Sequence, residues 1–170
     1  MAAAQYRAAL PVLETRRLVL RTPTLNDLPV WTAICKESFG DTDQEAWTEF
    51  SYYASGWILH GHGLFTAALR DQEVAIGFVV LGLEWDDQEP ELGYLFSADH
   101  RMQGYATEAC AAVRDFGFDL LGSGCFVSYV SASNTRSNAL AKRLGAVRDV
   151  NAEHAFGADQ HVWRYGEVQA

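Results

Sequence analysis

One unit constrains the fold of this chain more than any other: a strand, a polar loop and a helix between residues 91 and 121. The apolar segment ELGYLFS (91–97) has the composition of a strand, and the helix after the loop begins at Gly104, Tyr105 and Ala106. A helix normally begins at Ser, Thr, Asp or Asn, whose side-chain oxygen accepts hydrogen bonds from free backbone N–H groups. The small residues here supply no such oxygen, so another group is needed to accept those hydrogen bonds.

The loop before this helix has the spacing Arg-x-x-Gly-x-Ala, from Arg101 to Ala106. Free N–H groups and the helix dipole make a helix start a binding site for anions, and glycine lets the backbone approach a phosphate closely. The loop therefore suits a pyrophosphate, and the alternative is a plain turn that uses Gly104 for a positive φ. Neither GxGxxG after a strand nor GxxxxGK[ST] occurs, which argues against the dinucleotide-binding and P-loop folds.

The elements around this unit predict one mixed α/β domain spanning residues 1–170. Leu28, Trp31 and Cys35 recur at helical spacing in a first helix, within the segment 24–39. The other predicted elements are a strand over 16–24, a helix over 43–59, a hairpin of strands at 64–70 and 74–85, a strand over 125–132, a helix over 133–145 and two final strands near 152–156 and 161–168. This order gives a central sheet with helices packed on it.

Composition limits the partners and the location. The 170 residues are 49% hydrophobic with a net charge of −9, which suits one apolar core and does not suit binding to nucleic acid or an anionic membrane. The sequence shows no signal-peptide pattern and no apolar span of membrane length, so we expect a cytoplasmic protein with Cys35, Cys110 and Cys125 reduced. The HGHG segment (60–63) has no further ligand cluster, so we expect no metal.

Three blocks of the sequence together resemble the GNAT superfamily of acyl-CoA-dependent N-acyltransferases. ELGYLFSADHRMQGYATEACAAVRDFGF is similar to the family's motif A, in which an [Arg/Gln]-x-x-Gly-x-[Gly/Ala] loop holds the coenzyme A pyrophosphate. VSYVSASNTRSNALAKRLGAV is similar to the next block, and LETRRLVLRTPTLNDLP resembles the start of the RimJ/RimL-like branch, which includes ribosomal-protein N-terminal acetyltransferases. The resemblance implies an α/β fold with a single mixed sheet of about six to seven strands, splayed in the middle and flanked by about four helices.

The same resemblance implies acetyl-CoA as the cosubstrate and assigns residues to it. The strand edge at Leu95 and Phe96 would bind the pantetheine arm, and one freed N–H there would polarise the thioester carbonyl. Asn134 would touch the cofactor arm or an ordered water, and its alternative role is the N-cap of the helix. The pyrophosphate would lie on the loop residues Arg101, Met102, Gln103, Gly104, Tyr105, Ala106 and Thr107, with a solvated loop arginine as the alternative for Arg101.

Three residues are candidates for proton transfer in the implied reaction, the attack of a neutral amine on the thioester. Glu91 matches an acidic position often found at the start of the motif A strand, which makes it a candidate general base, with a surface glutamate as the alternative. Glu153 is its rival, because the RimL-like branch carries an acidic residue in a comparable late strand. Ser137 matches the helix serine that would protonate the departing thiolate, and it could otherwise bond to the backbone in the first turn.

The sequence says least about the acceptor of the acetyl group. We expect acetyl-CoA and an amine acceptor as partners, without nucleic acid or membrane, and a homodimer is left open. The acceptor is either a protein N-terminal α-amine or a small amine such as a polyamine, an amino acid or an antibiotic. Tyr53 and Trp57 are candidates for lining the acceptor cleft. The competing class of function is a non-catalytic acyl-CoA-binding domain.

Overall fold

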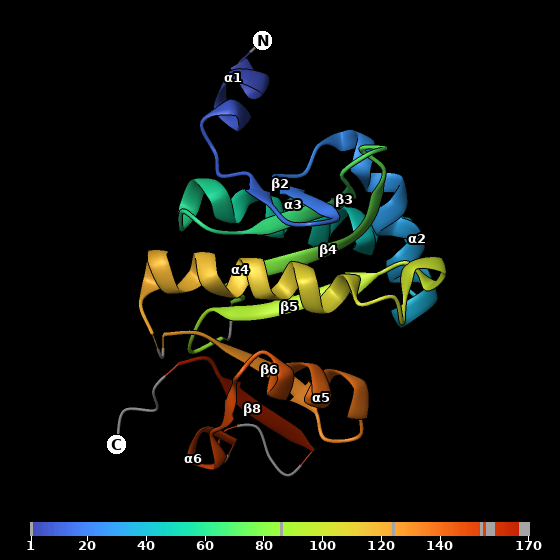
Figure 1. Ribbon diagram of the computed structural model, residues 1–170. Coiled ribbons are helices and arrows are strands. Elements are labelled where there is room, and N and C mark those ends of the chain that lie inside the picture. The colour runs from blue at the N-terminus through green and yellow to red at the C-terminus, as the bar shows by residue number, and fades with distance from the viewer. Residues whose placement is uncertain (1, 86, 124, 154, 156–158, 167–170) are drawn as a thin grey trace.

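The computed structural model describes residues 2–85, 87–123, 125–153, 155 and 159–166, which form one sheet with helices on both faces (Figure 1). Eight strands lie in these ranges, in the order β1-β2-β3-β4-β5-β6-β8-β7. They are β1 (Leu13–Glu14), β2 (Leu18–Arg21), β3 (Leu64–Leu69), β4 (Ala75–Gly82), β5 (Glu91–Phe96), β6 (Val127–Ser131), β7 (Val147–Arg148) and β8 (Gln160–Arg164). The predicted mixed α/β sheet is confirmed, and it exceeds six to seven strands because the two-residue strands β1 and β7 extend its edges.

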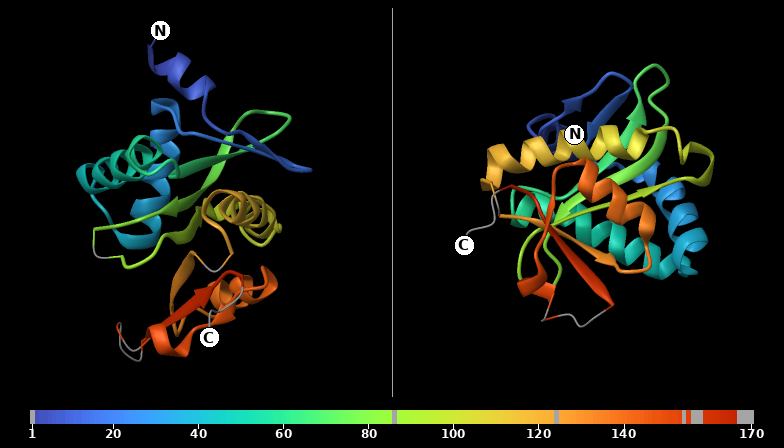
Figure 2. Two further views of the ribbon diagram at one scale, coloured as in Figure 1. Left: turned by 90° about the vertical axis from the view of Figure 1, so that its left-hand side faces the viewer. Right: turned by 60° about the horizontal axis from the view of Figure 1, so that its bottom comes forward.

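Helices cover the two faces of the sheet. Alternate side chains of β3 and β4 point to opposite faces, so Phe65 and Val79 pack with the core beneath α4 while Leu64 and Phe78 pack against α2 and α3. Figure 2 shows α2 and α3 on one side of the strands and α4 on the other. The helices are α1 (Ala2–Ala8), α2 (Leu28–Phe39), α3 (Asp43–Leu59), α4 (Tyr105–Leu121), α5 (Thr135–Arg143) and α6 (Val150–Glu153), with short 3-10 turns η1 (Leu25–Asp27) and η2 (Ala98–His100).

Two differences from the predicted elements lie toward the chain ends. The prediction of a strand near 152–156 is wrong where the chain is described, since Val150–Glu153 form α6, and residues 154 and 156 lie outside the described part. The Asp149 carboxylate accepts a hydrogen bond from the Ala152 amide at 3.0 Å, which stabilises a helical turn there. Helix α1 was not predicted. Among the described residues, no helix is both long enough and apolar enough to cross a membrane.

The sheet opens between β5 and β6, which form the one parallel pair among the described strands. Their pairing is limited to a single registered position, Glu91 opposite Val127, whereas β4 and β5 remain paired from Gly82 opposite Glu91 to Gly77 opposite Phe96. Figure 1 shows β6, β8 and α5 as a layer that diverges from β5. The splay that the sequence resemblance implied is therefore present, and most of β5 has one edge without a neighbouring strand.

Alternation along β5 decides which backbone groups face this opening. The Ser97 amide, just past the end of β5, donates to the Ile76 carbonyl beside β4 at 3.0 Å. In an antiparallel pair, the N–H and C=O of one residue point to the same edge and those of the next residue point to the other. The backbone groups of Leu95 therefore face β4, and those of Tyr94 and Phe96 face the opening.

Asp27 anchors the first helix on the sheet. Its carboxylate accepts two hydrogen bonds from Arg21 of β2 at 2.7 and 2.8 Å, one from the Thr24 amide at 2.7 Å and one from Thr66 of β3 at 3.2 Å. The side chain of Asp27 is only 4% exposed. Burial alone would raise its pKa, but the hydrogen bonds from Arg21 and Thr24 hold that pKa below the usual value. The start of α2 is thus tied to two strands by one ionised group.

We predict that Asp27→Asn lowers the free energy of unfolding by about 3 kcal/mol, because it leaves the Arg21 guanidinium without its charge partner. The matched control is Glu14→Gln, which removes an exposed ion pair with Arg70 and should cost less than about 1 kcal/mol. Urea denaturation of the three proteins measures both values. Equal losses in the two variants would contradict the anchoring role of Asp27.

Candidate active site

The start of α4 leaves backbone amides without a protein acceptor. Gly104 occupies the N-cap position with φ of +81° and supplies no side-chain cap, as its sequence predicts. The first intrahelical bond runs from the Glu108 amide to the Gly104 carbonyl at 3.1 Å. The amides of residues 105–107 have no hydrogen-bond acceptor among the described residues. Three donors and the positive end of a 17-residue helix therefore point at one place, which suits an anion.

Arg17, which the sequence did not single out, lies against this helix start. Its Nε atom pairs with the Glu108 carboxylate at 2.7 Å, its Nη1 atom donates to the Gln103 carbonyl at 2.9 Å, and its guanidinium carbon lies 4.3 Å from the centre of the Tyr105 ring. Burial alone would raise the pKa of Glu108, but hydrogen bonds from Thr15 and Arg17 lower it. Arg17 thus offsets the charge of Glu108, so that this carboxylate does not oppose an anion at the free amides.

Arg101, by contrast, is bound to protein groups. Its Nε atom donates to the Phe96 carbonyl at 2.9 Å, and its Nη1 atom donates to Glu37 of α2 at 3.0 Å. Met102, the next residue, has a left-handed φ of +62°. The contacts of Arg101 favour a role in holding the loop against β5 and α2, with the neighbouring backbone turned sharply toward Gly104.

A cavity of about 310 Å³ lies between the helices α2 and α3 and the strands β4 and β5. It contains Tyr53, which the sequence proposed for an acceptor cleft, whereas Trp57 is buried and donates its indole N–H to the Leu64 carbonyl. The cavity also reaches β5 through three consecutive residues. Its lining residues are Trp31, Phe39, Asp41, Glu49, Tyr53, Leu64, Phe78, Val80, Glu91, Gly93, Tyr94 and Leu95.

Glu91 lies at the start of β5 and lines this cavity. Burial, together with the charges of Asp87 and Glu84, raises the pKa of its carboxyl group to about 8. One contact opposes this shift, a long hydrogen bond of 3.4 Å from the Tyr129 amide to Glu91 Oε1. A carboxyl group with a pKa near neutrality can accept and release a proton at physiological pH.

Tyr94 and Ser137 meet across the opening of the sheet. Their hydroxyl oxygens are 2.9 Å apart, and Tyr94 also lines the cavity. Burial raises the pKa of Tyr94. Ser137 belongs to the first turn of α5, where its amide donates to Asn134 Oδ1 at 3.1 Å. Asn134 is therefore the N-cap of α5, which was its alternative role.

Asn138 holds α5 in place on the far side of the opening. Its Oδ1 atom lies 2.8 Å from Trp163 Nε1 and 2.8 Å from His161 Nδ1, both on β8. Its Nδ2 atom donates to the Ser131 and Asn134 carbonyls at 3.0 and 2.8 Å. These contacts fix the helix that carries Ser137 relative to the C-terminal strands.

Glu153 is placed apart from the cavity. It lies in α6, where Arg148 binds both carboxylate oxygens at 2.6 and 2.8 Å and the Val162 amide donates to one of them at 3.2 Å. The hydrogen bond from Arg148 is the main cause of its lowered pKa. Of the two carboxylates suggested by the sequence, Glu91 alone lines the cavity.

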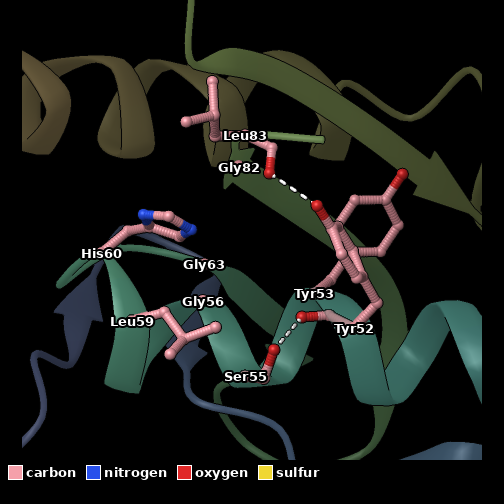
Figure 3. Close-up of a pocket in the computed structure, with 9 residues that line it drawn as sticks. All are labelled: Tyr52, Tyr53, Ser55, Gly56, Leu59, His60, Gly63, Gly82 and Leu83. Carbon is pink, nitrogen blue, oxygen red and sulfur yellow. Dashed lines mark hydrogen bonds between the residues drawn. The ribbon is translucent and has the colours of Figure 1, made fainter. Parts of the chain in front are cut away.

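A second pocket of about 40 Å³ lies behind Tyr53, at the ends of α3 and β4 (Figure 3). Its Tyr52 hydroxyl donates to the Leu83 carbonyl at 2.9 Å, and the Ser55 hydroxyl donates to the Tyr52 carbonyl at 2.6 Å. The Tyr53 hydroxyl donates to Glu84. The volume has room for roughly a few water molecules, so this pocket is too small for the acceptor or the coenzyme.

Comparisons with known proteins agree on one family. A family profile described as an acetyltransferase (GNAT) domain matches residues 17–147. The solved structure of an acetyltransferase from Agrobacterium tumefaciens str. C58 has a TM-score of 0.85 at 31% identity and covers 94% of this chain and 96% of that chain. RimL, a ribosomal L7/L12 α-N-protein acetyltransferase solved in complex with coenzyme A, has a TM-score of 0.69 at 16% identity, covers 93% of this chain and 98% of that chain, and is similar in fold.

A curated relative matches a shorter segment. It is the uncharacterized N-acetyltransferase YnaD of Bacillus subtilis (strain 168), which is 27% identical over 85 residues. The match covers 50% of this chain and spans half the length of the Bacillus protein.

The raised pKa of Glu91 predicts a pH-dependent stability. Between the ordinary pKa of a glutamate, about 4.3, and the folded value of about 8, the folded state binds more protons than the unfolded state. The free energy of unfolding should therefore fall as pH rises from 5 to 8.5, by at most about 1.4 kcal/mol for each unit of pKa shift. Glu91→Gln should lack this component, so its stability relative to wild type should increase over the same range. Urea denaturation at several pH values tests this, and parallel curves for the two proteins would contradict it.

Proposed function

Because the chain belongs to the GNAT acetyltransferase family, we propose that it transfers an acetyl group from acetyl-coenzyme A to a primary amine by direct attack in a ternary complex. The observation that carries this proposal is that a site for the coenzyme and a cavity for the acceptor lie on the same strand, β5. The free amides at the start of α4 and the opening beside Tyr94 suit the coenzyme, and the cavity that contains Glu91 suits the acceptor. In the reaction the C–S bond of the thioester breaks, the C–N bond of an amide forms, and the amine proton must leave.

The residues that bind the coenzyme follow from the exposed donors. We assign the pyrophosphate to the loop 101–107, where the amides of 105–107 and the guanidinium of Arg17 converge. The pantetheine arm would pair with the open edge of β5 at the Tyr94 backbone and the Phe96 N–H, since Arg101 already binds the Phe96 carbonyl. The backbone of Leu95 faces β4 and its side chain lines the cavity. One N–H at that edge would polarise the thioester carbonyl as negative charge develops on its oxygen. The RimL complex with coenzyme A supports this choice of cosubstrate.

Glu91 is the proposed general base. An alkyl ammonium ion must lose a proton before its nitrogen can attack, and a base with a pKa near the working pH combines availability with strength. The pKa of about 8 for Glu91 meets this condition, and its place in the cavity lining puts it next to an acceptor. Glu153 is bound to Arg148 on both oxygens and is not assigned this role.

Tyr94 and Ser137 form the proposed general acid. A thiol has an ordinary pKa of about 8.5, so the departing thiolate needs little assistance, and one hydroxyl donor suffices. Because the two hydroxyls are 2.9 Å apart, a proton given up by one can be replaced from the other. A domain that only binds acyl-CoA would not need this pair or a base with a near-neutral pKa, so these groups favour turnover over binding alone.

We predict that Gly104→Glu raises the Kd for acetyl-CoA at least about a hundredfold, because the new carboxylate would lie where the pyrophosphate binds. The fold should persist, since a Cβ at Gly104 would meet Arg17 Nη2 at 3.4 Å and no other heavy atom within 4 Å. Gly104→Gln has the same size and backbone strain without the charge, and it should lose clearly less affinity. Calorimetric titration measures the affinity of both variants for acetyl-CoA, and melting temperatures test their fold. Unchanged affinity in Gly104→Glu would contradict the pyrophosphate site at this loop.

We also predict that Tyr94→Phe and Ser137→Ala each lower kcat and kcat/KM together, by about tenfold to a hundredfold, because a general acid acts in the transition state. If the two hydroxyls act as a unit, the double variant should be little slower than the slower single variant. Steady-state release of coenzyme A measures the rates, and Asn134→Ala is the stability control because it removes the α5 cap at a cost of about 1 kcal/mol. If the losses of kcat in the two single variants multiply in the double variant, the two hydroxyls act independently, and the paired general acid is contradicted.

A further inference from the structure

The acceptor cavity has a charge that the proposed reaction does not explain. Three of its twelve lining residues are acidic, Asp41, Glu49 and Glu91, and none is Lys, Arg or His. The proposed transfer uses one of them, Glu91. The two others come from a different part of the fold, the turn between α2 and α3 and the α3 helix itself. A group of the acceptor that binds to Asp41 and Glu49 is therefore distinct from the attacking amine.

Asp41 presents an oxygen without a partner. Its Oδ2 atom is buried and accepts no hydrogen bond from the described residues. One oxygen of Asp41, one of Glu49 and the Cys35 sulfur all lie within 4.8 Å of one another. A buried carboxylate oxygen is costly unless a donor reaches it, so this atom indicates a place for a ligand's N–H group.

The groups beside the Asp41 oxygen are also buried or close to other negative charges. Burial raises the pKa of Glu49, and the carboxylates of Asp41, Glu84 and Glu45 raise it further. Burial also raises the pKa of the Cys35 thiol to about 12, with Glu49 and Asp41 adding to the shift. In both groups burial is the larger cause of the shift, and neighbouring negative charge adds to it.

Cations near the cavity in the described structure are bound elsewhere. Lys36 follows Cys35 in the chain, but its ammonium group pairs with Asp43 at 2.7 Å. Arg101 pairs with Glu37 at 3.0 Å. Neither of these cations is therefore paired with Asp41 or Glu49.

Aromatic rings line the same cavity as these carboxylates. Trp31, Phe39, Tyr53 and Phe78 all line the cavity. Such rings pack against the methylene groups of an alkyl chain, and their faces attract an ammonium ion. A volume of about 310 Å³ is at the small end of the range for small-molecule pockets, which suits a short aliphatic amine.

We propose that the acceptor is a small aliphatic amine that carries a second cationic group, such as a diamine. This assignment rests on the proposed function. The attacking nitrogen lies beside Glu91, which takes its proton. The second ammonium group binds to Asp41 and Glu49. The acetyl carbon exchanges its bond to sulfur for a bond to nitrogen, and the thiolate takes a proton from the Tyr94–Ser137 pair. Asp41 and Glu49 thus determine specificity without taking part in the bond changes.

The test compares three acceptors of equal chain length with acetyl-CoA: putrescine, which has two amino groups, butylamine, which has one, and γ-aminobutyrate, which ends in a carboxylate. Release of coenzyme A gives kcat/KM for each. We expect the diamine to exceed butylamine by about tenfold or more, as an ionic hydrogen bond to a carboxylate would produce, and γ-aminobutyrate to be the poorest acceptor.

Matched variants assign the preference to residues. Asp41→Asn and Glu49→Gln should each reduce the ratio of putrescine to butylamine by about tenfold, mainly through KM for the diamine. Asp43→Asn is the control: it makes the same chemical change two residues away, but its side chain is 80% exposed and paired with Lys36, so the ratio should stay at the wild-type value. A fall in the ratio in the control as large as in Asp41→Asn would overturn the assignment.

The outcomes separate this inference from the proposed function. Acetylation of all three amines at equal efficiency, or a better rate with a neutral peptide N-terminus than with putrescine, would reject the diamine while leaving the transferase intact. Loss of the putrescine preference on adding EDTA would also reject it, because Asp41, Glu49 and Cys35 would then hold a metal ion. No release of coenzyme A with any amine, despite binding of acetyl-CoA, would reject the proposed function itself.

Discussion

A strand that is paired fully on only one side is the constraint on which the rest of this structure depends. β5 pairs with β4 along its length but with β6 at a single position, Glu91 opposite Val127. Backbone groups that a sheet would normally satisfy are left facing the opening at Tyr94 and Phe96, and such groups require partners. Arg101 provides one of these partners, because its Nε atom donates to the Phe96 carbonyl. The same divergence lets a side chain of β5 reach Ser137 on α5, since no strand lies between them.

The charges of the site are arranged in two opposite groups around β5. At the start of α4, free amides and the helix dipole create a positive region, with the charge of Glu108 neutralised by Arg17. In the cavity on the side of α2 and α3, carboxylates are present without cations among the lining residues. The two regions match an anionic cosubstrate and a cationic acceptor, and they meet at the strand where the proposed transfer takes place.

Several elements were predictable because their signals are local. The helix over 43–59 is found as α3, Asp43–Leu59, and the hairpin at 64–70 and 74–85 is found as β3 and β4, since helical spacing and a short polar turn depend on neighbouring residues alone. The uncapped helix start at Gly104 was predictable for the same reason. The strand near 152–156 was not, because the Asp149 side chain binds the Ala152 amide and the described part of that segment belongs to the short helix α6, Val150–Glu153.

The sequence by itself determined the strand, loop and helix around Gly104, the acidic start of β5 at Glu91 and the order of elements from β2 to α5. Tertiary structure alone decided which side chains meet. Arg17 reaches Glu108 from 91 positions away, and Tyr94 reaches Ser137 from 43 positions away. It also buried an Asp41 oxygen without a partner beside Glu49. Spacing along a chain sets local geometry, whereas burial and the distance between remote charges exist only after the helices have packed on the sheet.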